Sequence, residues 1–210
     1  MESYRTVRRQ AADEFVERRS RFIGAVCPVT TEQDAVAFIN EKKKIHWDAA
    51  HNVYAYILRD GQIRRYSDDG EPQGTAGIPV LDVLQKAGLT DCAVVVTRYF
   101  GGVLLGAGGL VRAYAHAAGL AVRAGEPVEM RPCTVAAITA DYPRYGMLER
   151  LIPAAGGVIE DTAFAAEVTV RFHIEDDRLD VLQKQLTEQS AGRLTVTKLD
   201  HTFAPFAVEA

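Results

Sequence analysis

Residues 91–123, DCAVVVTRYFGGVLLGAGGLVRAYAHAAGLAVR, decide the fold of this chain. The near-continuous apolar run 91–97 predicts a strand that is buried on both faces of a sheet. An alanine-rich helix is predicted over about residues 110–123, because alanine has the highest helix propensity. Five glycines separate the two elements. This part of the chain is therefore predicted to cross from a central strand to a helix through a glycine-rich connection.

The residues before this stretch predict antiparallel strands followed by a helix. Residues 4–29 are rich in β-prone side chains and are broken at Pro28, which favours antiparallel strands. Thr30 or Thr31 is suited to cap a helix, and Lys42–Lys44 lie at its predicted C-terminal end, where the helix dipole favours cations.

A hairpin and a short helix are predicted next. Residues 51–58 and 62–66 have the composition of strands, and Asp60–Gly61 between them is typical of a hairpin turn. A short helix is predicted from Pro79, which suits the first helical position, to Gly88, which suits the residue after a helix.

The residues after about 130 alternate strands and helices in the order βαββαβ. The predicted strands are residues 133–140, 157–163, 165–174 and 194–206, and the predicted helices are residues 143–151 and 176–189. This order is the split pattern of ferredoxin-like domains. The chain is therefore predicted to be an α+β protein with two domains, residues 1–130 and 131–210.

The charge of the chain is unevenly distributed. Its 210 residues include 24 Lys or Arg and 28 Asp or Glu, so the formal net charge is −4. The whole chain therefore lacks the polycationic character of many nucleic-acid and acidic-lipid binders. Basic and acidic residues balance at 16 each over residues 1–130, and the acidic excess lies in the second domain. Any contact with a polyanion is expected in the first domain.

The cysteines and the apolar runs favour a cytoplasmic protein without a membrane partner. Cys27, Cys92 and Cys133 are far apart and form no CxxC motif. An odd number of scattered cysteines argues against a disulfide framework and against a cysteine metal site. No apolar run approaches the ~20 residues of a membrane span, and the first residues lack the apolar segment of a signal peptide.

The glycine-rich connection, residues 98–109, is the first candidate site, and we call it the glycine loop. Glycines let a backbone approach a ligand closely, and a helix N-terminus favours a bound anion. Arg98 and Arg112 flank the loop with guanidinium groups suited to phosphate. The predicted phosphate- or nucleic-acid-binding residues are Arg98, Tyr99, Gly101, Gly102, Gly106, Gly108, Gly109, Arg112 and His116.

The glycine loop matches neither standard phosphate motif. No Gly-Lys-Ser/Thr follows it, so it is not a P-loop, and Gly106-Ala-Gly108 is followed three residues later by Val111 rather than glycine. Two other interpretations stay open. Small residues could serve tight packing of the helix on the sheet while Arg98 neutralises an acidic side chain, or the loop could be a catalytic phosphate site.

The second candidate site is residues 67–77, SDDGEPQGTAG, which we call the acidic loop. Asp68, Asp69 and Glu71 place three carboxylates within four residues, and such a group could hold a magnesium ion beside a phosphate. The spacing is not that of an EF-hand, and Asp-Asp-Gly also suits a turn. Ion pairs with Arg98 or Arg112 are the alternative. We predict no cofactor, with magnesium as the open possibility.

The sequence assigns no catalytic residue and favours a non-enzymatic protein. None of the four serines lies in a Gly-x-Ser-x-Gly motif, and the cysteines have mostly apolar neighbours, which raise the pKa of a thiol. His46 and His51 are five residues apart rather than four apart on a helix, so they do not have the spacing of a zinc peptidase. They are predicted to be hydrogen-bonding or surface histidines.

Two long motifs resemble the IMPACT family, specifically its bacterial YigZ-like members. They are YSDDGEPQGTAGIP at residues 66–79 and VVTRYFGGVLLGAGGLVRAY at residues 95–114. RSRFI at residues 19–23 and AHN at residues 50–52 support the match. The two motifs occur in the family's order and spacing, and the resemblance covers nearly the whole chain.

The resemblance implies a fold and a field of function. The first domain is expected to contain a left-handed βαβ unit, as in a ribosomal small-subunit protein, domain IV of elongation factor G and the GHMP kinases. The second is expected to be similar to the last domain of elongation factor G. Eukaryotic relatives are associated with regulation of translation initiation and use an additional RWD domain, which these residues do not contain. Bacterial members are regarded as nucleic-acid or ribosome binders, and their occasional label as peptidases has no support in these residues.

Three functions stay open, and we predict the first. It is a translation-linked protein whose first domain binds RNA or ribosome phosphates through Arg98 and Arg112. Four aromatic residues are candidates to stack on bases, namely Tyr66, Tyr99, Phe100 and Tyr114. The second is a magnesium-dependent enzyme acting on a phosphorylated or nucleotide-like small molecule. The third is a protein-interaction module in which both loops only build the fold.

Overall fold

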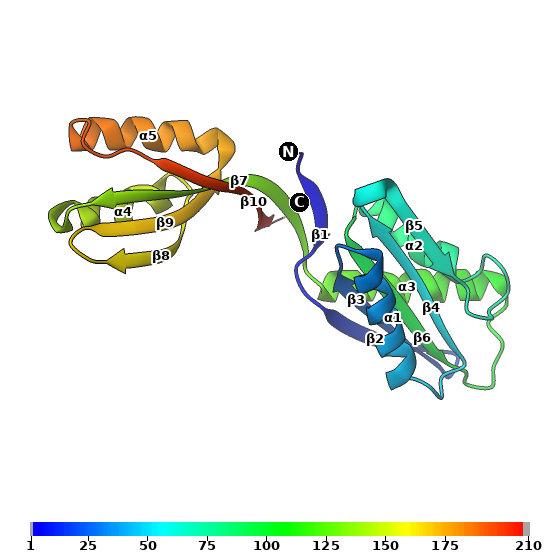
Figure 1. Cartoon of the computed structure of the whole chain (residues 1–210). Helices are drawn as coiled ribbons and strands as arrows, with labels where there is room; N and C mark the ends of the chain where they lie inside the picture. The colour runs from blue at the N-terminus through cyan, green and yellow to red at the C-terminus, as the bar shows by residue number, and fades with distance from the viewer. Residues whose placement is uncertain (1, 208–210) are drawn as a thin grey trace. The chain divides into compact units, whose positions relative to one another are not determined.

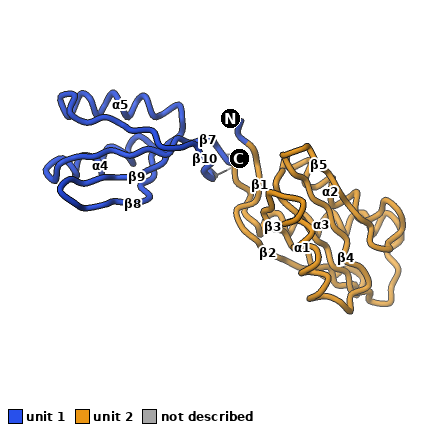
Figure 2. Tube along the Cα trace, viewed as in Figure 1, with its two compact units in different colours: residues 1–3, 130–206 blue, residues 4–129, 207–210 orange. Residues whose placement is uncertain are grey.

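The computed structural model describes residues 2–207, which form two compact units (Figures 1 and 2). The first unit contains residues 4–129 and 207, and the second contains residues 2–3 and 130–206. The two sheets and five α-helices confirm the predicted α+β fold class with two domains.

The first unit is built on a five-stranded antiparallel sheet with the order β2-β3-β6-β4-β5. Its strands are β2 (Ala11–Glu17), β3 (Ser20–Pro28), β4 (His51–Leu58), β5 (Ile63–Ser67) and β6 (Cys92–Tyr99). The central strand, β6, is buried on both faces, as its apolar run predicts. Val94 and Val96 belong to one hydrophobic core, and Ala93 and Val95 belong to the core on the other face.

Three α-helices cover this sheet (Figure 1). Helix α1 (Glu32–Ile45) packs on one face, and α2 (Gly77–Lys86) and α3 (Ala107–Ala124) pack on the other. Helix α1 begins with a capping box between Thr31 and Asp34, so Thr31 is the cap of the predicted helix.

Three element boundaries in the first unit differ from the prediction. Helix α3 begins at Ala107, so the glycines at 108 and 109 lie in its first turn. Helix α2 begins at Gly77, two residues before the proline, because the Asp68 carboxylate caps its start. The hairpin between β4 and β5 is a short 3-10 turn, η1 (Asp60–Gln62), in which Gly61 and Gln62 both have positive φ.

The second unit has the predicted βαββαβ order. Its elements are β7 (Pro127–Ala140), α4 (Tyr142–Ala154), β8 (Val158–Phe164), β9 (Val168–Glu175), α5 (Asp176–Ser190) and β10 (Thr197–Ala207). Strands β10, β7, β9 and β8 lie in that order, which is the ferredoxin-like arrangement, and β1 (Tyr4–Val7) also pairs with β7. Leucines from α4 and α5, including Leu148 and Leu182, pack on the sheet.

Strand β7 begins at Pro127, in the first unit, six residues before the predicted strand 133–140, and runs on through Pro132. The three cysteines are free thiols, and burial raises the pKa of Cys92 to about 12.

Within residues 2–207, no helix is both long enough and apolar enough to cross a membrane.

Candidate functional site

Four loops meet at one end of the first unit, which we call the loop end (Figure 1). They are the β2–β3 turn, residues 46–50, the acidic loop and the glycine loop. Backbone atoms join them, since the Ala50 amide donates to the carbonyl oxygen of Arg98 at 3.0 Å. The Arg18 guanidinium donates to the carbonyl oxygen of Leu104 at 3.4 Å. Both predicted site loops therefore lie at the same end of the sheet.

A buried polar cluster connects the acidic loop to β6 and α3. Nη1 of Arg98 lies 2.6 Å from Oε1 of Glu71, and the Tyr114 hydroxyl donates to the same oxygen at 2.7 Å. The side chains of Glu71 and Arg98 are only 3% and 6% exposed. Burial and the bond to Glu71 raise the pKa of Tyr114, so its hydroxyl remains a hydrogen-bond donor.

Arg98 is enclosed by the protein rather than presented to solvent. Its guanidinium carbon lies 5.5 Å and 5.4 Å from the ring centroids of Phe22 and Phe100, and Nη2 donates to Ser20 at 3.4 Å. Its Nε is the one buried side-chain nitrogen or oxygen of residues 2–207 without a hydrogen-bond partner. Arg98 is therefore paired with Glu71 of the acidic loop. This ion pair is the alternative that the sequence left open beside phosphate binding.

The other two acidic-loop carboxylates also have partners in the chain. Asp68 accepts three hydrogen bonds of 2.8–3.1 Å at the start of α2, from the backbone amides of Gly74, Ala76 and Gly77. Asp69 pairs with Lys43 at 2.7 Å and accepts a hydrogen bond from the Asn52 amide at 2.7 Å. Over the described residues, no group of three or more His, Cys, Asp or Glu is placed to hold a metal ion.

The glycines of the glycine loop shape the chain before α3. A Cβ on Gly101 would lie 2.1 Å from the carbonyl carbon and oxygen of Arg19, so this glycine lets the loop lie against the β2–β3 turn. Gly102 and Gly106 have φ values of +81° and +72°, which glycine adopts without strain. In the part of the chain that the structure describes, no side chain caps the N-terminus of α3. Its first N–H groups are therefore available to a ligand.

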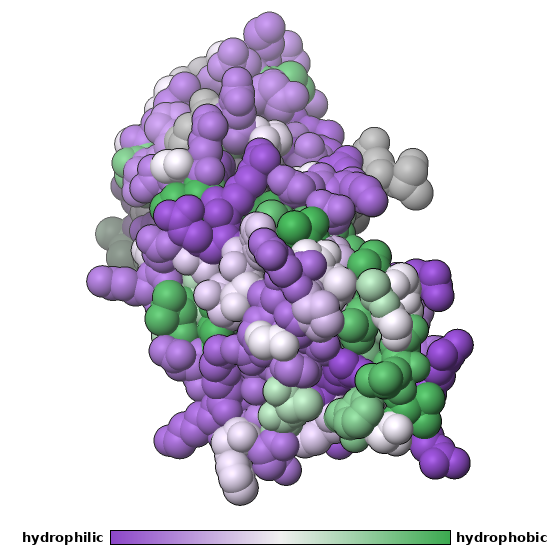
Figure 3. Space-filling view, turned by 90° about the vertical axis from the view of Figure 1, so that its right-hand side faces the viewer, coloured by the Kyte–Doolittle hydropathy of each residue, from purple (hydrophilic) through white to green (hydrophobic). Residues whose placement is uncertain are grey.

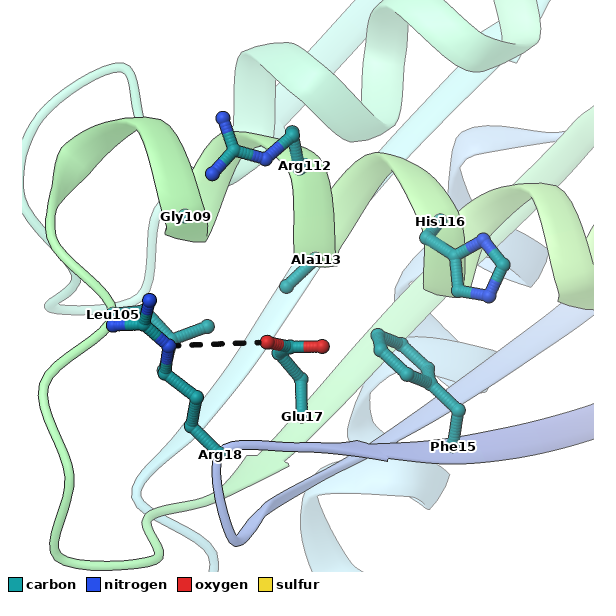
Figure 4. A pocket seen from close by; sticks show the side chains of 8 residues that line it. All are labelled: Phe15, Glu17, Arg18, Leu105, Gly109, Arg112, Ala113 and His116. Carbon is teal, nitrogen blue, oxygen red and sulfur yellow. Dashed lines mark ion pairs between the residues drawn. The ribbon is translucent and has the colours of Figure 1, made fainter.

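Arg112 and His116 line a pocket of about 460 Å³ between β2 and the first turns of α3 (Figure 4). We call it the Arg112 pocket, and its lining residues are Phe15, Glu17, Arg18, Leu105, Gly109, Arg112, Ala113 and His116. Figure 4 marks one ion pair, in which Arg18 lies 4.0 Å from Glu17. Among the residues drawn in Figure 4, Arg112 has no ion pair. The predicted neighbours Arg112 and His116 therefore share one pocket, while Arg98 belongs to another.

That second pocket, of about 410 Å³, contains the buried polar cluster. We call it the Glu71 pocket, and it is lined by Ala50, His51, Glu71, Pro72, Arg98, Phe100, Leu104, Leu105, Gly106, Ala107 and Leu110. Leu105 lines both pockets. The start of α3 is thus flanked by a basic pocket and by a largely apolar one with buried charges.

Tyr99, predicted to bind nucleic acid, is held by the loop before β4. Its hydroxyl lies 3.0 Å from Nδ1 of His46 and donates to Asp48 at 3.2 Å. Burial lowers the pKa of His46, and the nearby cations Lys42 and Arg21 lower it further. Tyr99 therefore fixes the loop that contains His46.

Trp47 and Leu104 are exposed apolar side chains at the loop end that the sequence analysis did not predict, whereas Phe100 was a predicted base-stacking residue. Trp47 is 82% exposed, Leu104 80% and Phe100 50%. Figure 3 shows hydrophobic side chains gathered on part of this face, among hydrophilic ones. Loop residues have no hydrophobic periodicity, so no sequence pattern predicts that these side chains are exposed. The sequence signal for such a surface patch is the presence of tryptophan and leucine within a polar loop.

The β2–β3 turn was also missed as part of the site. Glu17 and Ser20 form its closing pair, so Arg18 and Arg19 are the two central residues. Their φ values are +45° and +66°. Such turns favour Asn-Gly, so two arginines give no sequence signal for a tight hairpin.

Comparison with known proteins identifies the family. The family model described as "Impact N-terminal domain" matches residues 18–122, and the one described as "Domain of unknown function (DUF1949)" matches residues 138–193. The chain is 36% identical over 209 residues to the IMPACT family member YvyE of Bacillus subtilis, covering 99% of this chain and 96% of that protein. The chain belongs to the IMPACT family.

Other IMPACT family proteins match to different extents. The chain is 32% identical over 186 residues to YigZ of Escherichia coli, covering 87% of this chain and 91% of that one. Protein IMPACT of Xenopus laevis is 38% identical over 97 residues, covering 43% of this chain and 30% of that protein. A crystal structure of a hypothetical protein, 30% identical, has a TM-score of 0.60 and covers 95% of this chain and 98% of that one. The predicted resemblance is confirmed.

Proposed function

We propose that the first unit binds RNA, ribosomal RNA included, through its loop end, and that this chain of the IMPACT family acts in translation. The link to translation comes from the eukaryotic members of the family, which are associated with translation initiation. The charges and the exposed side chains of the loop end support the binding.

The observation that carries the proposal is the meeting of Arg18 and Arg112 in the Arg112 pocket. The two arginines come from the β2–β3 turn and from α3. Within residues 2–207, neither guanidinium is held by a carboxylate at hydrogen-bonding distance, since Glu17 is 4.0 Å from Arg18. Arginines with free donors suit bidentate contacts with phosphate. Gly109, in the first turn of α3, lines the same pocket, where the helix dipole favours an anion.

The conformation of the β2–β3 turn supports a role for its arginines. A non-glycine residue in the left-handed region costs about 1–2 kcal/mol, and here Arg18 and Arg19 both adopt it. The turn therefore retains two arginines at a cost in stability. Strained residues of this kind concentrate at binding sites, and phosphate contacts would offset the cost.

Exposed rings at the loop end supply surfaces for bases. Trp47 and Phe100 each leave at least half of their surface open to solvent. Stacking of an unpaired base on an aromatic ring contributes about 1–3 kcal/mol. The loop end thus combines phosphate-binding and base-stacking groups, the combination that single-stranded RNA requires.

Fluorescence anisotropy with a labelled single-stranded RNA of mixed sequence, over a series of salt concentrations, tests the proposal. The double variant Arg18→Gln/Arg112→Gln is expected to bind more weakly. The slope of log K against log salt is negative, and each lost phosphate contact reduces its magnitude by about 0.7, so the magnitude should fall by about 1.4.

Arg64→Gln is the matched control. Arg64 is an exposed arginine on β5 that pairs with Ile57, at the end of β4 far from the loop end. Its replacement changes the total charge but should leave affinity and slope nearly unchanged. Wild-type affinity and slope in the double variant would overturn the proposal. A protein that binds no RNA at all would also overturn it.

A further inference from the structure

The Glu71 pocket has the size and composition of a site for a small planar group. Its volume of about 410 Å³ is within the range of ligand pockets, roughly 300–1,000 Å³. Its walls include Leu104, Leu105 and Leu110, and its charged and titratable side chains are those of three residues, His51, Glu71 and Arg98. An apolar pocket with a few convergent polar groups is typical of specific recognition.

The hydrogen bond between His51 and the backbone of Asp69 determines which ring nitrogen of His51 is protonated. The other ring nitrogen, Nε2, is the one that lies near Glu71. Nδ1 of His51 lies 2.8 Å from the backbone carbonyl oxygen of Asp69. A carbonyl oxygen only accepts hydrogen bonds, so Nδ1 is the protonated nitrogen. In the neutral ring, Nε2 therefore carries a lone pair and accepts a hydrogen bond.

The second carboxylate oxygen of Glu71 is also an acceptor without a donor. Oε1 receives both hydrogen bonds of the buried cluster, from Arg98 and Tyr114. Oε2 receives no side-chain hydrogen bond from the described residues and lies 3.8 Å from Nε2 of His51. Two lone pairs thus converge at this pocket. A group that carries two hydrogens on one atom satisfies both acceptors at once, because it donates one hydrogen to each.

We infer that the Glu71 pocket binds the amino group of an unstacked nucleobase, adenine, cytosine or guanine, with the amino nitrogen donating to His51 Nε2 and Glu71 Oε2. These three bases carry an exocyclic NH₂ group, whereas uracil carries only carbonyl oxygens outside its ring. An oxygen there would face two acceptors and leave them unpaired. The pocket therefore selects amino-bearing bases over uracil.

The surroundings of the pocket suit a base that belongs to a strand. Phe100 and Leu104 line the pocket and are exposed, so the ring of Phe100 can cover the face of an inserted base. Leu105 is shared with the Arg112 pocket, where the proposed phosphate contacts lie. The inference rests on the proposed RNA binding and adds base selectivity to it.

Binding of labelled oligo-A, oligo-C and oligo-U by fluorescence anisotropy is the direct test. The wild-type protein is expected to bind oligo-A and oligo-C about tenfold more tightly than oligo-U, within the discrimination that one well-placed pair of hydrogen bonds gives. In His51→Leu, the affinities for oligo-A and oligo-C should fall to that for oligo-U, which should not change. Equal wild-type affinities for all three would overturn the inference and leave the proposed RNA binding intact.

Two further variants separate recognition from damage to the fold. Ala107→Met places a larger side chain in the lining of the pocket and leaves the His51 and Glu71 side chains in the sequence, and it should also abolish the preference. His201→Leu, an exposed histidine of the second unit, should retain it. A preference that survives both His51→Leu and Ala107→Met would overturn the inference.

Free nucleotides test the pocket without RNA. AMP and CMP at millimolar concentrations should raise the melting temperature more than UMP does, because a ligand that binds the folded state stabilises it. If no RNA binds but AMP and CMP stabilise more than UMP, the pocket inference stands and the proposed function is wrong. Equal effects of AMP, CMP and UMP, together with equal oligonucleotide affinities, would refute the inference.

Discussion

Glu71 and Arg98 form a buried ion pair, with 2.6 Å between Oε1 and Nη1, that fastens the acidic loop to the central strand. Removing two charges from water is costly, and their attraction offsets this only when further hydrogen bonds satisfy both groups. Tyr114 donates to Glu71, and Arg98 donates to Ser20. The pair is therefore part of the fold of the loop end. Each buried charge needs its partner, because an unpaired buried charge is strongly destabilising.

Breaking this pair on one side should destabilise the protein strongly. Arg98→Met leaves the Glu71 carboxylate buried without its cation, and we expect the free energy of unfolding to fall by about 3–5 kcal/mol. Glu71→Leu/Arg98→Met removes both charges and should recover much of the loss. Urea denaturation measures both variants.

An exposed pair in the second unit provides the control. Arg171 lies 3.0 Å from Glu160, with 54% and 33% of their side chains exposed. Arg171→Gln should cost less than about 1 kcal/mol. If Arg98→Met is no more destabilising than Arg171→Gln, the Glu71–Arg98 pair does not hold the fold.

Two glycines near the start of α3 should respond oppositely to alanine. A Cβ on Gly101 would overlap the Arg19 backbone, whereas the nearest atom to a Cβ on Gly108 is Nη1 of Arg112 at 3.7 Å. Gly101→Ala should destabilise by about 1–3 kcal/mol through overpacking. Gly108→Ala, at a helical position, should stabilise by up to about 1 kcal/mol. Thermal denaturation that gives the two variants equal melting temperatures would contradict the close approach at Gly101.

Much of the fold follows from the sequence because burial and periodicity act locally. The apolar run of β6 and the βαββαβ order of the second unit are such features. The burial of Arg98 follows from the same rule. Side chains alternate along a strand, so residue 98 lies on the same face as Val94 and Val96, which belong to the core under α2 and α3. The alternation along β6 thus assigns the Arg98 side chain to this face, a signal that the prediction of phosphate binding did not use.

Other parts of the site depend on contacts that no local pattern encodes. Asp68 caps a helix that starts nine residues later, at Gly77. Trp47 is exposed although tryptophan is usually highly buried. The pairing of Arg112 and His116, by contrast, was predictable from their separation of one helical turn. Sequence reasoning therefore located the glycine loop and the acidic loop but not the direction in which their charges point.

The β2–β3 turn gives a prediction in which stability and binding change in opposite directions. Arg18→Asn/Arg19→Gly installs the residues that this turn favours, and we expect the free energy of unfolding to rise by about 1–2 kcal/mol. The same variant loses two positive charges at the loop end and should bind RNA more weakly. Urea denaturation and anisotropy on one preparation measure both effects. A more stable variant with wild-type RNA affinity would remove the functional explanation of the strained turn.

The stability of the loop end should depend on pH through His46. Burial holds the pKa of this imidazole below the ordinary value of 6.5. Between the folded-state pKa and 6.5, the unfolded chain binds more protons than the folded chain, so the free energy of unfolding falls as the pH falls through this window. His46→Gln cannot be protonated and should lose less stability than the wild type from about pH 7.5 to about pH 5.5. Urea midpoints at both pH values measure the difference, and equal losses would show that His46 is not buried in its neutral form.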